Sequence, residues 1–257
     1  MSLSSAATVA TSERVLHVLA CVARQGQPMS ARDLVAQTGL PLSTIYRHLA
    51  ALKKWGWVQE HARSGLYEPG PLAVQLAHGF DQHSWLMQAA RADIEQLVER
   101  SGESVGLLCY LDGQVICLDM QESQQALRCS FAKGRTNSTV RGASAKALLA
   151  FLPDQTRQQH LDQHFVEIGT NAPQQEQHDR STLERSLQLI RQQGYATSEN
   201  EIDDGVWGVS APIFSGKHQV IATLSLMAPA ARAASRHNDL IHMTVTAAHG
   251  ISRVLQE

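Results

Sequence analysis

Hydroxyl and basic side chains share one face of the segment 41–54 when it is placed on a helix at 100° per residue. The opposite face is apolar and is formed by Leu42, Ile45, Leu49 and Leu52. Arginine can bind a guanine edge or hold a phosphate, serine and threonine hydroxyls can donate to either, and the small Ala50 permits close approach. This face, formed by Ser43, Arg47, Ala50 and Lys54 with Thr44 and Tyr46 on its flanks, therefore predicts a helix that contacts DNA. Lys53, near the end of the helix, is a further candidate contact.

The surrounding elements decide between a groove-binding helix and an ordinary solvated one. The sequence pattern predicts helices over 12–25 and 31–38 before this segment. After it, β-like runs at 57–60 and 66–68 are separated by a glycine-containing turn. Two helices, a tight turn, a third helix and a hairpin form, in this order, a winged helix-turn-helix, which we expect over residues 1–70.

Two more basic residues lie in these flanking elements. Arg32 is near the start of the second predicted helix, beside backbone N–H groups that have no partner within the helix. Arg63 is at the tip of the predicted hairpin, where it could reach an adjacent groove or phosphate. Ser30 predicts the N-cap of the second helix, and Gly39 predicts its end. We therefore add Arg32 and Arg63 to the candidate DNA contacts.

A second part of the chain follows a helical linker or dimerisation segment at 71–101. Its mixture of strands and helices predicts an α+β, sensor-like domain over residues 102–257. The stretch 155–178 is rich in Gln and His, and we expect it to be solvated surface. Strands are predicted at 104–110, 114–120, 126–131, 206–214 and 219–227, and helices at 143–152, 181–193 and 238–255.

Length, composition and charge restrict the class of protein. The chain has 257 residues, 43% hydrophobic, with a net charge of −2. Residues 1–80 hold seven basic and four acidic residues, a net of +3, and residues 81–257 carry −5. A small basic module joined to an acidic one fits a protein that binds DNA through one part. We read no signal peptide, no membrane span and no Cys-x-x-Cys pair among the four cysteines, which predicts a reduced, cytoplasmic protein.

The sequence resembles the IclR family of bacterial transcriptional regulators. The segment LVAQTGLPLSTIYRHLAALKKWGWV (34–58) looks like the helix-turn-helix signature of that family, and YEPG (67–70) looks like the end of its wing. In the second domain, GASAKALLAFLP (142–153), RQQGYATSENEIDDGVWGVSAPIF (191–214) and TLSLMAP (223–229) are similar to further family segments. The resemblance covers nearly the whole chain in order.

The resemblance implies a fold and partners. The fold is a winged helix, a linker helix and a GAF/PAS-like α+β domain that binds a small effector. The partners are a second copy of the chain, in dimers or tetramers, and a palindromic double-stranded operator; an activator would also contact RNA polymerase. Two half-sites a helical turn apart would multiply the affinity of one winged helix, which supports a dimer independently. No cofactor, metal or membrane is implied.

The resemblance also places the effector, commonly a small or aromatic carboxylate, at the start of a helix and beside the last strands. The matching residues are Gly142, Ala143, Ser144, Ser198, Gly208, Ser225 and Met227. Backbone N–H groups at a helix start bind anions. Departures from the family pattern are Ala145, where glycine usually precedes the lysine, Arg141, where a small residue is usual, and the non-polar Gly208 and Met227, with Trp207 adjacent.

These departures favour a bulky or aromatic acid over a two- or three-carbon acid. We hypothesise that Arg141 pairs with the carboxylate of the effector, while Trp207 and Met227 line an apolar wall. Alternatively, Arg141 faces solvent or an internal glutamate, and Trp207 fills the core or a subunit contact. The predicted function is an effector-responsive regulator of the catabolism of a small, aromatic carboxylic acid, either as repressor or as activator.

Three other functions are compatible with parts of the sequence. An enzyme is disfavoured because no catalytic motif is present, and the acidic cluster Glu199, Glu201, Asp203 and Asp204 is more typical of structural or solvated side chains. A metal-responsive regulator could use surface His pairs such as His160 with His164, or His242 near Asp239, although neither pair has a third ligand. A winged helix that contacts protein instead of DNA would bind without the salt dependence of phosphate contacts.

Overall fold

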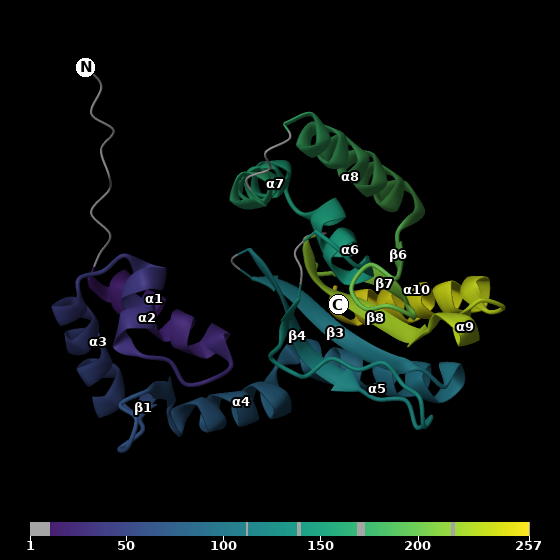
Figure 1. Ribbon diagram of the computed structural model, residues 1–257. Helices are drawn as coiled ribbons and strands as arrows, with labels where there is room; N and C mark the ends of the chain where they lie inside the picture. The colour runs from purple at the N-terminus through teal and green to yellow at the C-terminus, as the bar shows by residue number, and fades with distance from the viewer. Residues whose placement is uncertain (1–10, 112, 138–139, 169–172, 217–218, 257) are drawn as a thin grey trace. The chain divides into compact units, whose positions relative to one another are not determined.

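The computed structural model describes residues 11–256 apart from 112, 138–139, 169–172 and 217–218 (Figure 1). The chain divides into two compact units, Met1–Ser84 and Trp85–Glu257, and each has its own apolar core. The division falls inside the segment 71–101, which the sequence predicted as one helical linker. No helix among the described residues is both long and apolar enough to cross a membrane.

The first unit is a winged helix-turn-helix, as predicted. Its two short strands pair antiparallel, with Gln59 opposite Glu68. The buried stripe of the third helix, Ile45, Leu49 and Leu52, packs against the other two helices. The elements are α1 (Thr11–Gln25), α2 (Ala31–Thr38), α3 (Leu42–Lys54), β1 (Val58–Glu60), β2 (Tyr67–Pro69) and α4 (Leu72–His83).

Local sequence fixes the turn that precedes α3. Ser30 and Asp33 form a capping box at the start of α2: the Asp33 N–H donates to Ser30 Oγ at 3.2 Å, and the Ser30 N–H donates to the Asp33 carboxylate at 2.8 Å. Gly39 ends the helix with a φ of 68°, in the left-handed region that glycine adopts without a Cβ clash. The chain therefore reverses within a few residues and presents α3.

The second unit is built on one antiparallel sheet of six strands in the order β5-β4-β3-β8-β7-β6. Neighbouring strands place Ser198 beside Gly208 and Gly208 beside Met227, so three strands meet at one level of the sheet. The strands are β3 (Ser104–Leu111), β4 (Gln114–Gln121), β5 (Thr136–Asn137), β6 (Ala196–Glu199), β7 (Val206–Phe214) and β8 (Val220–Pro229).

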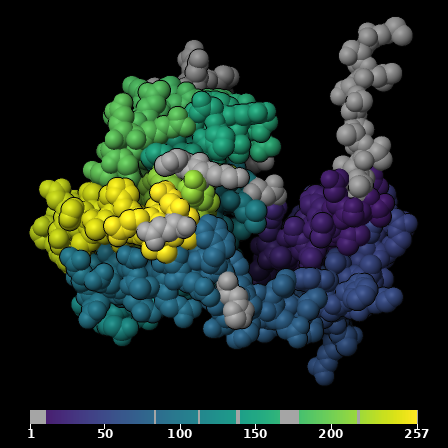
Figure 2. All heavy atoms as spheres, turned by 180° about the vertical axis from the view of Figure 1, so that it is seen from behind, coloured from purple at the N-terminus to yellow at the C-terminus, as the bar shows by residue number. Residues whose placement is uncertain are grey.

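Helices cover both faces of this sheet (Figure 1). On one face, α5 (Trp85–Ser101) and α10 (His237–Val254) pack against β3, β7 and β8, and Figure 2 shows α10 in yellow against α5 in blue. On the other face lies α6 (Ala143–Phe151), with α8 (Pro173–Gln193) packed against it and α7 (Asp154–Ile168) against α8. The short α9 (Ala230–Ala233) follows β8. The predicted α+β class is confirmed.

Two expectations about this unit were wrong. First, α5 is not a separate linker, because Leu86, Met87, Ile94 and Leu97 are buried in the core of the second unit. Second, the segment 126–131 is not a strand: Glu122 accepts hydrogen bonds from Arg128 Nε at 2.7 Å and from Ser130 Oγ at 2.6 Å, and these bonds hold the segment as a loop. The Gln/His-rich stretch 155–178, expected to be solvated surface, is largely helical in α7 and α8, and most of its described side chains are exposed or half-buried.

Candidate functional site

The predicted DNA-contacting face of α3 is exposed. The side chains of Tyr46 and Arg47 are exposed together with Ser43, and Thr44 is half-buried. The buried face matches the predicted apolar stripe except at Leu42, which is 41% exposed in the first turn. His48, which the prediction did not assign, is buried, and burial together with Arg47 and Arg14 lowers its pKa, so its imidazole is neutral at pH 7.

Lys53 and Lys54 have different surroundings at the end of α3. The Lys53 ammonium is bound to the carboxylate of Glu60 on β1, and this hydrogen bond raises the pKa of Lys53 and lowers that of Glu60. Lys53 therefore ties the helix to the base of the wing. Lys54 is exposed in the same turn and has no carboxylate partner among the described residues. The two lysines do not offer equivalent charge to DNA.

Arg32 and Arg63 are both exposed, on the elements that precede and follow α3. Arg32 is in the first turn of α2, next to the capping box of Ser30 and Asp33. Arg63 is in the turn between β1 and β2, at the tip of the wing. The structure thus places all eight predicted DNA contacts in the winged helix, and all except Thr44 are exposed.

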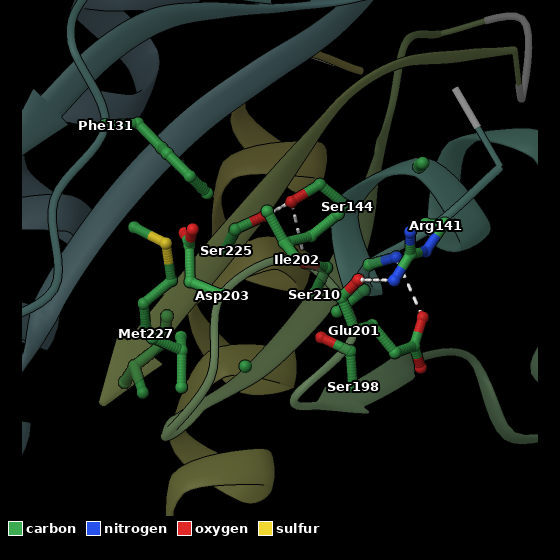
Figure 3. Close-up of a pocket in the computed structure, with 16 residues that line it drawn as sticks. Phe131, Arg141, Ser144, Ser198, Glu201, Ile202, Asp203, Ser210, Ser225 and Met227 are labelled. Atoms are coloured by element: carbon green, nitrogen blue, oxygen red, sulfur yellow. Dashed lines mark hydrogen bonds between the residues drawn. The ribbon is translucent and has the colours of Figure 1, made fainter. Parts of the chain in front are cut away.

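A pocket opens in the second unit where the start of α6 meets strands β6, β7 and β8 (Figure 3). Its empty space, including the solvent at its open mouth, is about 520 Å³. Eight of the nine predicted effector residues line it: Arg141, Gly142, Ala143, Ser144, Ser198, Gly208, Ser225 and Met227. The lining also includes eight residues that the prediction did not assign to the effector: Phe131, Ala145, Glu201, Ile202, Asp203, Val206, Ser210 and Leu226.

Three serine hydroxyls form the polar centre of this pocket. Ser225 Oγ lies 2.7 Å from Ser210 Oγ and 3.0 Å from Ser144 Oγ, and the Ser144 and Ser210 oxygens are 3.4 Å apart. Ser210 and Ser225 are register partners on β7 and β8, and α6 brings Ser144 over them. Because a hydroxyl can both donate and accept, this trio can turn toward a bound polar group without breaking the sheet.

The start of α6 supplies backbone donors to the same pocket. Gly142 is at the N-cap with a φ of 87° and no side chain to cap the helix, and a Cβ there would lie 3.0 Å from Ile202 Cγ1. The first-turn amides of Ala143, Ser144 and Ala145 have no carbonyl partner within the helix. Aligned helix dipoles make such a site favourable for an anion.

Glu201 and Lys146 hold this helix start in place. One Glu201 carboxylate oxygen accepts from the Gly142 N–H at 2.9 Å, and the other is 2.5 Å from Lys146 Nζ. Lys146 also donates to the Thr197 carbonyl at 3.0 Å, and its side chain is only 13% exposed. Arg141 donates to the backbone carbonyl of Glu201, so the guanidinium is near an internal glutamate while still lining the pocket (Figure 3).

Trp207 does not line the pocket, and its predicted place in an apolar wall is corrected. Successive side chains of a strand point to opposite faces, so Val206, Gly208 and Ser210 face the pocket while Trp207 faces α10. Its indole is 3% exposed and stacks on the His237 ring, with centroids 4.6 Å apart. The tryptophan fills the core, which was the alternative reading.

The metal-responsive alternative receives no support from the described residues. They contain no group of three or more His, Cys, Asp or Glu side chains placed to hold a metal ion. His160, taken as a surface residue, is buried and packs edge-on against the Tyr110 ring, with centroids 5.4 Å apart. His164 packs in the same way on Phe165, at 5.2 Å.

A winged helix-turn-helix joined to an α+β unit with a ligand-sized pocket defines the class of DNA-binding transcriptional regulators that carry their own sensor domain. Comparison with known proteins assigns the family. Residues 11–62 match the IclR helix-turn-helix domain, and residues 81–253 match the family described as bacterial transcriptional regulator IclR C-terminal. The chain belongs to the IclR family of bacterial transcriptional regulators, and it is not an enzyme.

Individual relatives agree with this assignment. The chain is 26% identical to the HTH-type transcriptional regulator KipR of Bacillus subtilis over 199 residues, 77% of this chain and 78% of KipR. An IclR family regulator from Brucella abortus has a similar fold, with a TM-score of 0.81, 20% identity and coverage of 98% and 95% of the two chains. An IclR homologue from Microbacterium hydrocarbonoxydans, solved with 4-hydroxybenzoate, has a TM-score of 0.71 at 22% identity, covering 96% and 99%.

Proposed function

We propose that this regulator binds a palindromic operator as a dimer or tetramer, and that a small carboxylic acid in the pocket of its second unit changes its affinity for DNA. The observation that carries the proposal is the meeting of Arg141, the amides of α6 and three serine hydroxyls in one pocket. A carboxylate needs charge-assisted donors of this kind. The complex of one structural neighbour with 4-hydroxybenzoate supports an aromatic acid.

Phe131, Ile202 and Met227 support the size of the proposed effector. They give the pocket apolar surface beside its polar centre, which a two- or three-carbon acid would leave largely uncovered. Gly208 leaves room beside Ser198, whose Oγ would lie 3.4 Å from an added Cβ. The regulated genes would then serve the catabolism of such an acid, and the protein would act on DNA in the cytoplasm.

DNA binding is proposed to use the exposed face of α3, Arg32 and the wing. The acid would bind the DNA-competent and DNA-incompetent arrangements with different affinities, and this difference is what shifts the equilibrium. The same scheme serves a repressor or an activator, and the activator would contact RNA polymerase in addition.

The test uses the full chain in two measurements. A melting-temperature screen of aromatic and aliphatic carboxylates should find an acid that stabilises the native state, and calorimetry should show weaker binding by Arg141→Ala. Binding to a palindromic fragment from the region beside its own gene should weaken as salt rises, because phosphate contacts release counterions. An unchanged acid affinity in Arg141→Ala would remove the role of the arginine, and salt-independent binding would argue against DNA.

A further inference from the structure

Asp203 is an acidic side chain of the pocket that the binding of a simple acid does not explain. It comes from the loop between β6 and β7 and lines the pocket. In Figure 3 its carboxylate is on the side of Met227, whereas Arg141 is on the other side of the serine trio. The pocket therefore has a cationic side and an anionic side, separated by neutral hydroxyls.

Other residues of the same loop have structural partners, whereas the exposed Asp203 carboxylate has none among the described residues. Asn200 Oδ1 accepts from the Gly205 N–H at 2.7 Å, and Glu201 is bound to Gly142 and Lys146. Asp203 contributes its backbone carbonyl, which accepts from the Val206 N–H at 3.3 Å. Within the part of the chain that the structure describes, no hydrogen bond or ion pair reaches its carboxylate.

The negative charge of Asp203 also acts on Cys129, which lies in the loop just before Phe131, a residue that lines the pocket. Burial raises the pKa of the Cys129 thiol, the charges of Glu103 and Asp203 raise it further, and the charge of Arg232 opposes them. The Cys129 thiol therefore stays neutral and adds no second negative charge near Asp203. Three ionisable residues line the pocket. Glu201 is paired with Lys146 and Arg141 donates to the Glu201 carbonyl, whereas the Asp203 carboxylate has no ion pair within the described residues.

Arg141 and Asp203 favour different chemical groups on a bound molecule. An acid whose carboxylate is held by Arg141 and the start of α6 presents its far end to Asp203. An apolar far end would remove water from that carboxylate, and a second carboxylate would repel it. A hydroxyl or ammonium group would instead donate a charge-assisted hydrogen bond.

We propose that Asp203 selects a carboxylic acid that carries a hydrogen-bond donor, a hydroxyl or an ammonium group, at the end remote from its carboxylate. This inference rests on the proposed function, in which the pocket binds an acid. It goes further because it assigns the second half of the ligand and makes Asp203 the specificity-determining residue.

Calorimetry on the full chain with a set of matched acids tests the proposal. Benzoate has no donor, 2-hydroxybenzoate has one beside its carboxylate, and 3- and 4-hydroxybenzoate have one remote from it. The native protein should bind a remote-donor acid about tenfold or more tightly than benzoate and 2-hydroxybenzoate, as expected for a hydrogen bond to a charged group. Adding 4-(aminomethyl)benzoate separates the two donors: tighter binding than 4-hydroxybenzoate assigns ammonium, and weaker binding assigns hydroxyl.

Variants connect this preference to the residue. Asp203→Ala should reduce the preference to about twofold or less, and Asp203→Asn, which removes the charge alone, should tighten the binding of benzoate. Asp204→Asn is the matched control, because Asp204 is exposed in the same loop, as Asp203 is, but does not line the pocket. It should keep the native preference. Unfolding curves will establish that the variants are folded.

Three results would overturn the proposal. Equal binding of benzoate and the remote-donor acids by the native protein would do so, and so would a preference that survives in Asp203→Ala. In both cases an acid still binds, so the proposed function stands without this specificity. If no carboxylic acid binds the native protein, both the acid-binding function and the role of Asp203 are rejected.

Discussion

Lys53 and Lys54 are neighbouring residues with the same charge, but among the described residues only Lys53 has a carboxylate partner. Lys54 is therefore better placed to contact a DNA phosphate. Lys53 is bound to Glu60, so a phosphate would have to compete with an existing carboxylate. We expect Lys54→Ala to reduce the slope of log affinity against log salt by about one per protomer, and Lys53→Ala to change it little. Fluorescence anisotropy on one operator fragment over a range of salt concentrations measures both. A larger loss in Lys53→Ala would show that its pair with Glu60 opens on DNA.

We expect Glu201 to stabilise the folded structure around the pocket. Its carboxylate satisfies the Gly142 N–H and the nearly buried Lys146 ammonium, and glutamine would leave that ammonium without a counter-charge. Glu201→Gln should therefore lower the free energy of unfolding by about 1–2 kcal/mol. Glu199→Gln is the control, since Glu199 is exposed on the adjacent strand β6. Equal urea midpoints for the two variants would contradict a supporting role for Glu201.

At the scale of elements, the capping box of α2 makes the stability of the winged helix depend on pH. Hydrogen bonds from the Ser30 side chain and backbone lower the pKa of Asp33 below its ordinary value. A lowered carboxyl pKa stabilises the fold at neutral pH, and this contribution is lost as the pH falls below about 4. Ser30→Ala should cost about 1 kcal/mol at pH 7 and less at pH 3. Unfolding curves at both pH values measure this, and a loss that does not depend on pH would exclude the Asp33 link.

The helices and strands with strong local signals were predictable. Ser30 and Gly39 marked α2 to the residue, and the apolar stripe of α3 gave its buried face. The strand β7 was also predicted with its observed bounds. The segment 126–131 failed because its alternating pattern is that of a strand, while the bonds that fix it as a loop come from the more distant Glu122. The helix α7 was not predicted because its sequence is largely polar and has few apolar positions that become buried, among them Leu161 and Phe165.

The pocket divides in the same way into predictable and unpredictable parts. Resemblance to the family, together with helix-start chemistry, gave eight of its lining residues. Strand alternation could have excluded Trp207, because its neighbour Gly208 was already assigned to the pocket face. Asp203 could not be distinguished from Asp204 by sequence, since both lie in an acidic loop. Only the path of that loop turns one carboxylate into the pocket and leaves the other outside.

At the scale of the whole molecule, the uneven charge corresponds to two units with different partners. The basic residues 1–80 belong to the winged helix, which meets phosphate, and the acidic remainder carries the pocket. A net charge of −2 is therefore no argument against DNA binding. Salt and effector should act on different units: salt directly weakens phosphate contacts, while the acid acts on DNA only through the equilibrium between two arrangements.

This coupling leads to a prediction about reciprocity. If an acid changes the affinity of the full chain for its operator by some factor, the operator must change the affinity for the acid by the same factor. We expect a factor of about 5–150, the usual range of coupling free energies. Calorimetric titration of the acid with and without operator, and anisotropy with and without acid, give the two ratios at one salt concentration. Arg141→Ala should weaken acid binding and leave the operator affinity without acid unchanged. Unequal ratios would show that the acid acts outside a simple two-state equilibrium, for example by changing the oligomeric state.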